Sequence, residues 1–231
     1  MSAPSSFDSC KDRYSELVNE SIAFSGLTVD FFARAKARHL IELATRSLRD
    51  LRRVQALDVG CGRGVIHPCL AGAFQSLTGV DVAPQTIELA RQANRWVQYQ
   101  TFDGGHLPFA NASFQLVFSI NVLHHVALPR RQAFVTELRR VTAPGGLVVI
   151  FEHNPYNLLT RYAVSRCPFD CDAVLLAARQ GKRLLREAGL ARVRCRYITF
   201  TPFEGRVASL IDRALGRVAL GAQYFVAGDA S

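Results

Sequence analysis

The sequence predicts an α/β fold built on a mostly parallel sheet. Across residues 54–151, short apolar runs alternate with segments of helical spacing, the pattern of parallel strands joined by crossover helices. The first apolar run ends in alternating glycines, Gly60, Gly62 and Gly64, and the next run ends in Asp81. Because glycine has no Cβ, such a loop can turn tightly and approach a ligand closely. This edge of the sheet is therefore expected to bind one.

The chain divides into an N-terminal helical cap, residues 1–53, and a main unit, residues 54–231. Apolar residues recur at helical spacing in segments 14–24 and 28–51, whereas the first ten residues are expected to be a loose terminus. Further helices are expected just after the glycine loop and over residues 85–93, 181–188 and 204–215. The strands after the first one are expected over residues 77–81, 96–101, 114–120, 147–151, 193–200 and 222–226.

Composition favours a globular protein and excludes several other classes. Of the 231 residues, 49% are hydrophobic and 20% charged, which suits one domain with a sizeable core. The net charge of +9 comes mostly from dispersed arginines without a nucleic-acid-binding motif, so we expect no nucleic-acid partner. No apolar run is long enough to span a bilayer, and no signal segment is recognisable.

The cysteines predict neither a metal site nor disulfides. All six are scattered, and only Cys167 and Cys171 are close, without the second pair or the histidine spacing that zinc requires. We therefore expect reduced thiols, a cytoplasmic location and no metal.

The glycine loop and Asp81 together indicate a nucleoside cofactor. An acid about 20 positions after such a loop can accept hydrogen bonds from ribose hydroxyls. A dinucleotide fingerprint, G-x-G-x-x-G, would need a glycine where Val65 stands, since here the third glycine is Gly64. This difference argues against a nicotinamide-dependent oxidoreductase. The structural alternative to a ligand-binding loop is a simple tight turn.

The loop, with Asp58 before it, resembles motif I of the class I S-adenosylmethionine (SAM)-dependent methyltransferases. Matching segments follow in that family's order over residues 54–152: Asp81, Asp103 after the third strand, residues 121–125 after the fourth, and the turn 144–146 before the fifth. One departure is Gln115, where the family usually has an acid, but it lies at the strand end away from the ligand.

This resemblance implies a Rossmann-like, seven-stranded sheet with an antiparallel last strand, helices on both faces, and SAM as cofactor. Asp103 would lie near the adenine amino group, and Asp58 would brace the loop. The cofactor-binding residues that it implies are Asp58, Gly60, Cys61, Gly62, Asp81, Val82, Asp103, Gly104 and Asn121.

The acceptor side is expected at the ends of the fourth and fifth strands. If the acceptor must lose a proton, as an alcohol would, then His153, Glu152 and His124 are the candidate catalytic residues, because histidine titrates near neutrality. For His124 and His125, the family resemblance instead favours a role in shaping the cofactor side. Residues 155–170 look like an insertion over the site.

The predicted function is methyl transfer from SAM to a small-molecule or lipid-linked acceptor, with oxygen the favoured atom. Peripheral membrane contact through residues 204–220 is a further expectation. A non-catalytic binding or assembly protein with this fold remains the alternative from another class. The oligomeric state is left open.

Overall fold

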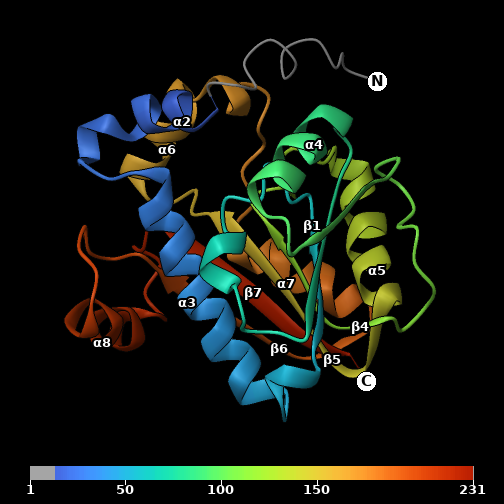
Figure 1. Ribbon diagram of the computed structural model, residues 1–231. Coiled ribbons are helices and arrows are strands. Elements are labelled where there is room, and N and C mark those ends of the chain that lie inside the picture. The colour runs from blue at the N-terminus through green and yellow to red at the C-terminus, as the bar shows by residue number, and fades with distance from the viewer. Residues whose placement is uncertain (1–13, 231) are drawn as a thin grey trace.

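The computed structural model describes residues 14–230 (Figure 1). The expectation for the first ten residues, with Cys10, lies outside this part of the chain. Among the described residues, no helix has both the length and the apolar character needed to cross a membrane.

Seven strands form one sheet in the order β3-β2-β1-β4-β5-β7-β6. β7 runs antiparallel to both of its neighbours, whereas the pairs among β1 to β5 are all parallel. The predicted seven-stranded, mostly parallel sheet with an antiparallel last strand is confirmed. The strands are β1 (Gln55–Val59), β2 (Ser76–Asp81), β3 (Gln98–Thr101), β4 (Phe114–Ile120), β5 (Thr142–His153), β6 (Leu190–Ile198) and β7 (Gln223–Ala230).

The strand order reverses between β1 and β4, because the chain first builds outward to β3 and then returns to the other side of β1. Ligands of open α/β sheets bind beyond the carboxyl ends of the strands at such a reversal. The glycine loop directly follows β1, so it lies at this position.

Helices cover both faces of the sheet. They are α2 (Tyr14–Ile22), α3 (Val29–Ser47), α4 (Pro84–Ala93), α5 (Arg131–Val141), α6 (Leu158–Arg166), α7 (Ala178–Glu187) and α8 (Arg206–Leu215). The side chains of Thr28 and Asn157 cap α3 and α6 by accepting backbone N–H bonds, which satisfies donors that a helix start leaves free. α3 ends earlier than the spacing of residues 28–51 predicts, and Leu51–Arg53 form a separate 3-10 turn.

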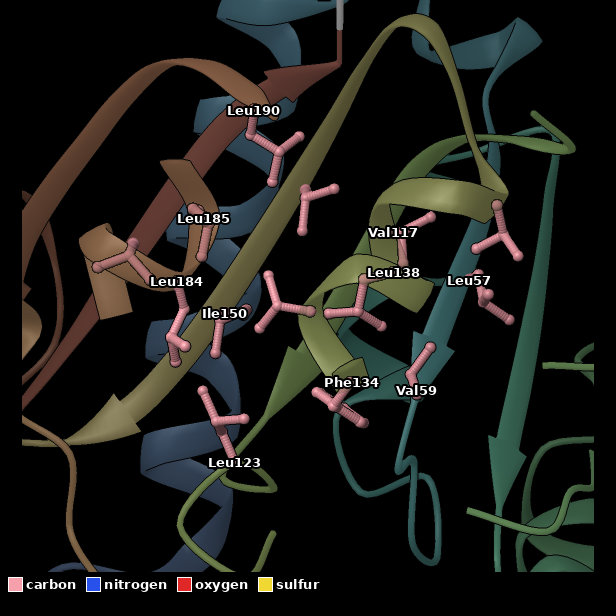
Figure 2. Close-up of a cluster of buried hydrophobic side chains, with 14 of the residues drawn as sticks. Leu57, Val59, Val117, Leu123, Phe134, Leu138, Ile150, Leu184, Leu185 and Leu190 are labelled. Carbon is pink, nitrogen blue, oxygen red and sulfur yellow. The ribbon is translucent and has the colours of Figure 1, made fainter. Parts of the chain in front are cut away.

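Two layers of apolar side chains hold the helices on the sheet. Leu57, Val59 and Val117 point to the face covered by α5 and α7, and Figure 2 shows these side chains between sheet and helices. The alternate β4 residues Leu116 and Phe118 point to the opposite face, where α3 packs (Figure 1). The long helix of the expected cap therefore shares its core with the sheet.

The prediction of a helix directly after the glycine loop is wrong. A short 3-10 turn, His67–Leu70, stands there instead. The backbone bends back at once: the Ala73 N–H donates to the Leu70 carbonyl and the Gln75 N–H to the Val54 carbonyl, which directs the chain into β2.

Candidate functional site

One large cavity lies at the carboxyl ends of the central strands. Its volume is about 1760 Å³, well above the 300–1,000 Å³ typical of a pocket for one drug-sized ligand. The loops after β1, β2, β3 and β4 form its floor, and parts of α2, α3 and α6 form its walls. At its rim, Phe24 and Tyr162 meet edge to face with ring centroids 5.0 Å apart, beside the contact of α2 with α6 (Figure 1). The cavity has room for a cofactor and an acceptor together.

The glycine loop forms one end of this cavity and depends on the absence of side chains. Gly60 has φ +78°, and a Cβ there would lie 2.4 Å from Cγ2 of Val122. Gly62 has φ +52°, but a Cβ there would meet nothing within 4 Å. The N–H groups of Gly60 and Cys61 both donate to the Val80 carbonyl, at 2.8 and 3.0 Å. Packing against Val122 and bonding to β2 therefore fix the shape of the loop.

Asp58 braces the loop from below. Its Oδ2 accepts a hydrogen bond of 3.0 Å from Nε2 of the fully buried His67, whose Nδ1 pairs with the Tyr99 hydroxyl. Burial raises the pKa of Asp58, although His67 offsets part of the effect. The second oxygen, Oδ1, is buried without a hydrogen-bond partner among residues 14–230. Asp58 also lines the cavity.

Asp81 joins the end of β2 to the glycine loop. Its Oδ2 accepts from the Gly62 N–H at 2.8 Å, and its Oδ1 accepts from the Ala83 N–H at 3.0 Å. Burial raises the pKa of Asp81 against these two hydrogen bonds. Each carboxylate oxygen keeps a further lone pair, so the group can also accept from a ligand hydroxyl.

Asp103 and Asn121 complete this end of the cavity in different ways. Asp103 is exposed, and its Oδ1 accepts from the N–H groups of His106 and Gly105, which lowers its pKa. Asn121 adopts φ +55°, a conformation that asparagine tolerates better than most residues. Its Oδ1 is buried without a partner within the described chain.

All nine predicted cofactor residues line the one cavity, and their individual roles stay predictions. They are Asp58, Gly60, Cys61, Gly62, Asp81, Val82, Asp103, Gly104 and Asn121. Burial raises the pKa of the Cys61 thiol well above its usual range, so this thiol is a neutral filler of the loop.

A cluster of charged groups marks the other end of the cavity. Glu152 is fully buried, and its two oxygens contact the Leu123 N–H at 2.8 Å and His124 Nδ1 at 2.6 Å. Nε2 atoms of both His124 and His125 lie 3.4 Å from Oδ1 of Asp170. Burial alone would lower the pKa of His124, but Glu152 and Asp170 raise it to about 9. The cluster therefore favours a positive charge at His124.

The three predicted catalytic residues differ in access to the cavity. His153 and His124 line it, whereas Glu152 lies behind His124 with both oxygens occupied. Burial and the neighbouring His124 lower the pKa of His153 to about 4, so its ring is neutral near pH 7. Glu152 can orient His124, but it cannot itself touch an acceptor.

Lys36 is a candidate that the sequence reading missed. It lies on α3, is only 6% exposed and lines the cavity. Burial lowers its pKa to about 8, and the Glu152 carboxylate only partly opposes this shift. A buried lysine is rare without a functional reason. The sequence feature that could have identified Lys36 is its place among the buried residues of α3, between Ala33 and Ala37.

Comparisons with known proteins agree with this fold. Residues 57–150 match the protein family described as "Methyltransferase domain". The demethylmenaquinone methyltransferase of Tropheryma whipplei (strain Twist) is 31% identical over 124 residues, covering 48% of this chain and 50% of that protein. The ubiquinone biosynthesis O-methyltransferase of Cereibacter sphaeroides (strain ATCC 17025 / ATH 2.4.3) is 33% identical over 100 residues, covering 42% and 40%.

The chain thus spans half or less of the length of these curated relatives. Over nearly the whole chain, the likeness is one of fold. The crystal structure of a SAM-dependent methyltransferase from Thermotoga maritima has a TM-score of 0.64 at 17% identity, covering 95% of this chain and 99% of that one.

Proposed function

We propose that this chain, a member of the class I SAM-dependent methyltransferase family, transfers a methyl group from SAM to a hydroxyl of a largely apolar small molecule. The observation that carries the proposal is the single cavity, which joins the glycine loop to Lys36 and His153. Cofactor and acceptor can therefore occupy one continuous space, as a direct transfer requires.

The glycine-loop end fits the cofactor. Asp58 Oδ1 and Asn121 Oδ1 are buried acceptors without partners in residues 14–230, which is costly unless a ligand supplies hydrogen-bond donors. Asp81 is placed to accept from ribose hydroxyls, and the bare loop at Gly62 allows close approach. SAM, when bound, supplies an electrophilic methyl group on its sulfonium. The residues of the chain supply position and environment.

Lys36 and His153 are assigned to the acceptor. Because the pKa of Lys36 is lowered to about 8, a fraction of its amine is neutral at physiological pH and can accept a hydroxyl proton at Nζ. The neutral His153 ring can hydrogen-bond the acceptor oxygen. Holding that oxygen in line with the methyl group is worth on the order of 7–11 kcal/mol of the barrier. His124 lines the cavity beside His153, and Glu152 acts as a positioning residue behind His124.

The cavity walls favour an apolar acceptor. Phe32, Val164 and Phe200 line it. Phe24 and Leu159 also line it, and these two residues are 46% and 64% exposed to solvent. An acceptor with an apolar tail could leave the cavity through this apolar rim. The two curated relatives carry names that refer to menaquinone and ubiquinone methylation. We therefore propose a phenol or quinol, free or lipid-linked, as the substrate class, with peripheral membrane contact for the lipid-linked case.

Thermal unfolding with SAM, S-adenosylhomocysteine or NADH tests the cofactor. At a hundredfold excess over its dissociation constant, a ligand stabilises the folded state by about 2.7 kcal/mol, which raises the Tm by roughly 5–10 °C for a domain of this size. We expect a rise with the two sulfur nucleosides. A rise with NADH alone would contradict the proposal.

Release of S-adenosylhomocysteine then tests the transfer. The acceptor panel pairs simple phenols with phenols that carry a polyprenyl tail, and we expect faster release with the tailed compounds. SAM binding without release from this panel or a cell extract would favour the non-catalytic alternative.

A further inference from the structure

Three potential metal ligands converge beside the acceptor end of the cavity. His124 and His125 follow β4, and Asp170 ends the 3-10 turn Pro168–Asp170 after α6. One ligand atom from each lies within 4.8 Å of the others, and all three residues line the cavity. Both Nε2 atoms lie 3.4 Å from the same oxygen, Oδ1 of Asp170. The cluster joins two segments that are distant in the sequence.

The hydrogen bonds of His124 suit a metal ligand. Its Nδ1 donates to Glu152 at 2.6 Å. A metal ion bound at Nε2 would displace the proton that this nitrogen carries in the charged ring, and the ring would keep its Nδ1–H on Glu152. That Nε2 is buried and has no hydrogen bond within the described residues. Metal-binding histidines almost always donate their other ring N–H to a carboxylate or carbonyl, which fixes the tautomer. A second carboxylate, Asp172, lies 3.8 Å from Nδ1 of His125 in the corresponding place.

The distance from each histidine to Asp170 matches tetrahedral coordination. Two ligand atoms 3.4 Å apart, each held at about 2.0–2.1 Å from one ion, subtend an angle of about 110° at that ion. Imidazole nitrogen and carboxylate oxygen are ligands that zinc accepts. The half-buried carboxylate of Asp170 and the buried carboxylate of Glu152 together offset the two positive charges of such an ion.

We propose that His124, His125 and Asp170 bind one divalent ion of the zinc class, with an open coordination position that faces the acceptor end of the cavity. Three protein ligands with a fourth position left open characterise catalytic rather than structural zinc sites. An acceptor oxygen in that position would lose its proton more readily. This role at the acceptor rests on the proposed function, whereas the metal site itself does not. The spacing of the cysteines could not reveal it, because no cysteine is among the ligands.

Cobalt(II) substitution tests the site without using methyl transfer. The protein is treated with a chelator, dialysed and titrated with Co²⁺ while its visible absorption is recorded. We expect a saturable band of tetrahedral intensity at about equimolar Co²⁺. Asp170→Asn and His125→Ala should each weaken Co²⁺ binding at least tenfold. His106→Ala, which changes an exposed histidine paired with Glu137, should leave it unchanged. Azide should alter the band, because it can occupy an open position.

Each outcome decides one part of the proposal. No saturable band, or a band that persists in both ligand variants, would overturn the metal site. A cluster-dependent band that azide does not change would overturn the open position. SAM binding is measured by calorimetry on the same chelated samples, which also shows that the variants are folded. SAM binding without a Co²⁺ band would refute the metal site alone, and a band without SAM binding would refute the proposed function alone.

Discussion

The two ends of the cavity are built by different means. At the cofactor end, backbone groups of loops that directly follow strands make the key contacts, such as the Gly62 N–H on Asp81. At the acceptor end, side chains from α3, β5 and the turn after α6 meet, such as Lys36, His153 and Asp170. The first end follows from short segments that directly follow strands β1 to β4, whereas the second depends on how distant elements pack. Changes at one end should therefore affect cofactor binding, and changes at the other should affect turnover.

The largest expected effect comes from a side chain in the glycine loop. Gly60→Val should abolish measurable SAM binding in calorimetry, because a Cβ there would meet Val122 at 2.4 Å and φ is +78°. The matched control is Gly72→Ala, at φ +73° with nothing within 4 Å of the added Cβ. It keeps the backbone strain of about 1–2 kcal/mol but adds no collision. Equal losses of SAM affinity in the two variants would contradict a role for packing on Val122.

Lys36→Met should separate the two ends. We expect the initial rate of S-adenosylhomocysteine release to fall by about 10²–10⁴-fold, the usual contribution of a general base, while the SAM dissociation constant changes little. Lys36→Arg, which keeps a charge but cannot lose its proton, is the control and should be equally slow. If Lys36→Arg restores the rate, the residue provides charge and not a base.

The Lys36→Met variant should also be more stable than the unaltered protein, by an amount that depends on pH. The pKa of Lys36 is lowered from 10.5 to about 8 by burial, against Glu152 and beside His153. The unfolded chain therefore binds more protons between these two values, and the stability of the native protein rises with pH across that window. At pH 7, Lys36→Met should add up to about 3 kcal/mol to the free energy of unfolding. Urea unfolding at pH 7 and pH 10 checks both the gain and its loss.

Residues at the two ends of the cavity differ in how far the sequence predicts them. Gly60 and Asp81 follow from a local pattern of strand, loop and acid, because backbone geometry there needs few partners, whereas the seven-stranded sheet is expected only from the family resemblance. Lys36 and Asp170 escaped prediction because their chemistry depends on burial and on neighbours far along the chain. The pairing of Glu152 with His124 shows the same limit. The sequence placed both residues near the site, but it could not show that Glu152 lies behind His124.

Asp81→Asn should have the next effect at the cofactor end. The amide keeps the shape but loses the charge, and a hydrogen bond to a charged group is worth about 1.5–3 kcal/mol. We expect SAM affinity to fall by roughly 10- to 150-fold in calorimetry, with the acceptor KM little changed. Glu88→Gln, an exposed change on α4, is the control. An unchanged SAM affinity in Asp81→Asn would remove this residue from the ribose site.

The smallest loss of SAM affinity is expected for Asp103→Asn. This variant tests whether the contribution of an acid to SAM binding depends on its position in the cavity or on its exposure to water. Asp103 lines the same end of the cavity as Asp81, but it is exposed to water and its Oδ1 already accepts two backbone N–H bonds. Water screens its charge, and Asp103→Asn retains an oxygen that can hold the turn. SAM affinity should therefore fall less than in Asp81→Asn, and rising salt should narrow the difference from the unaltered protein. A larger loss than in Asp81→Asn would mean that SAM binding buries Asp103, so that the loop closes over the bound cofactor.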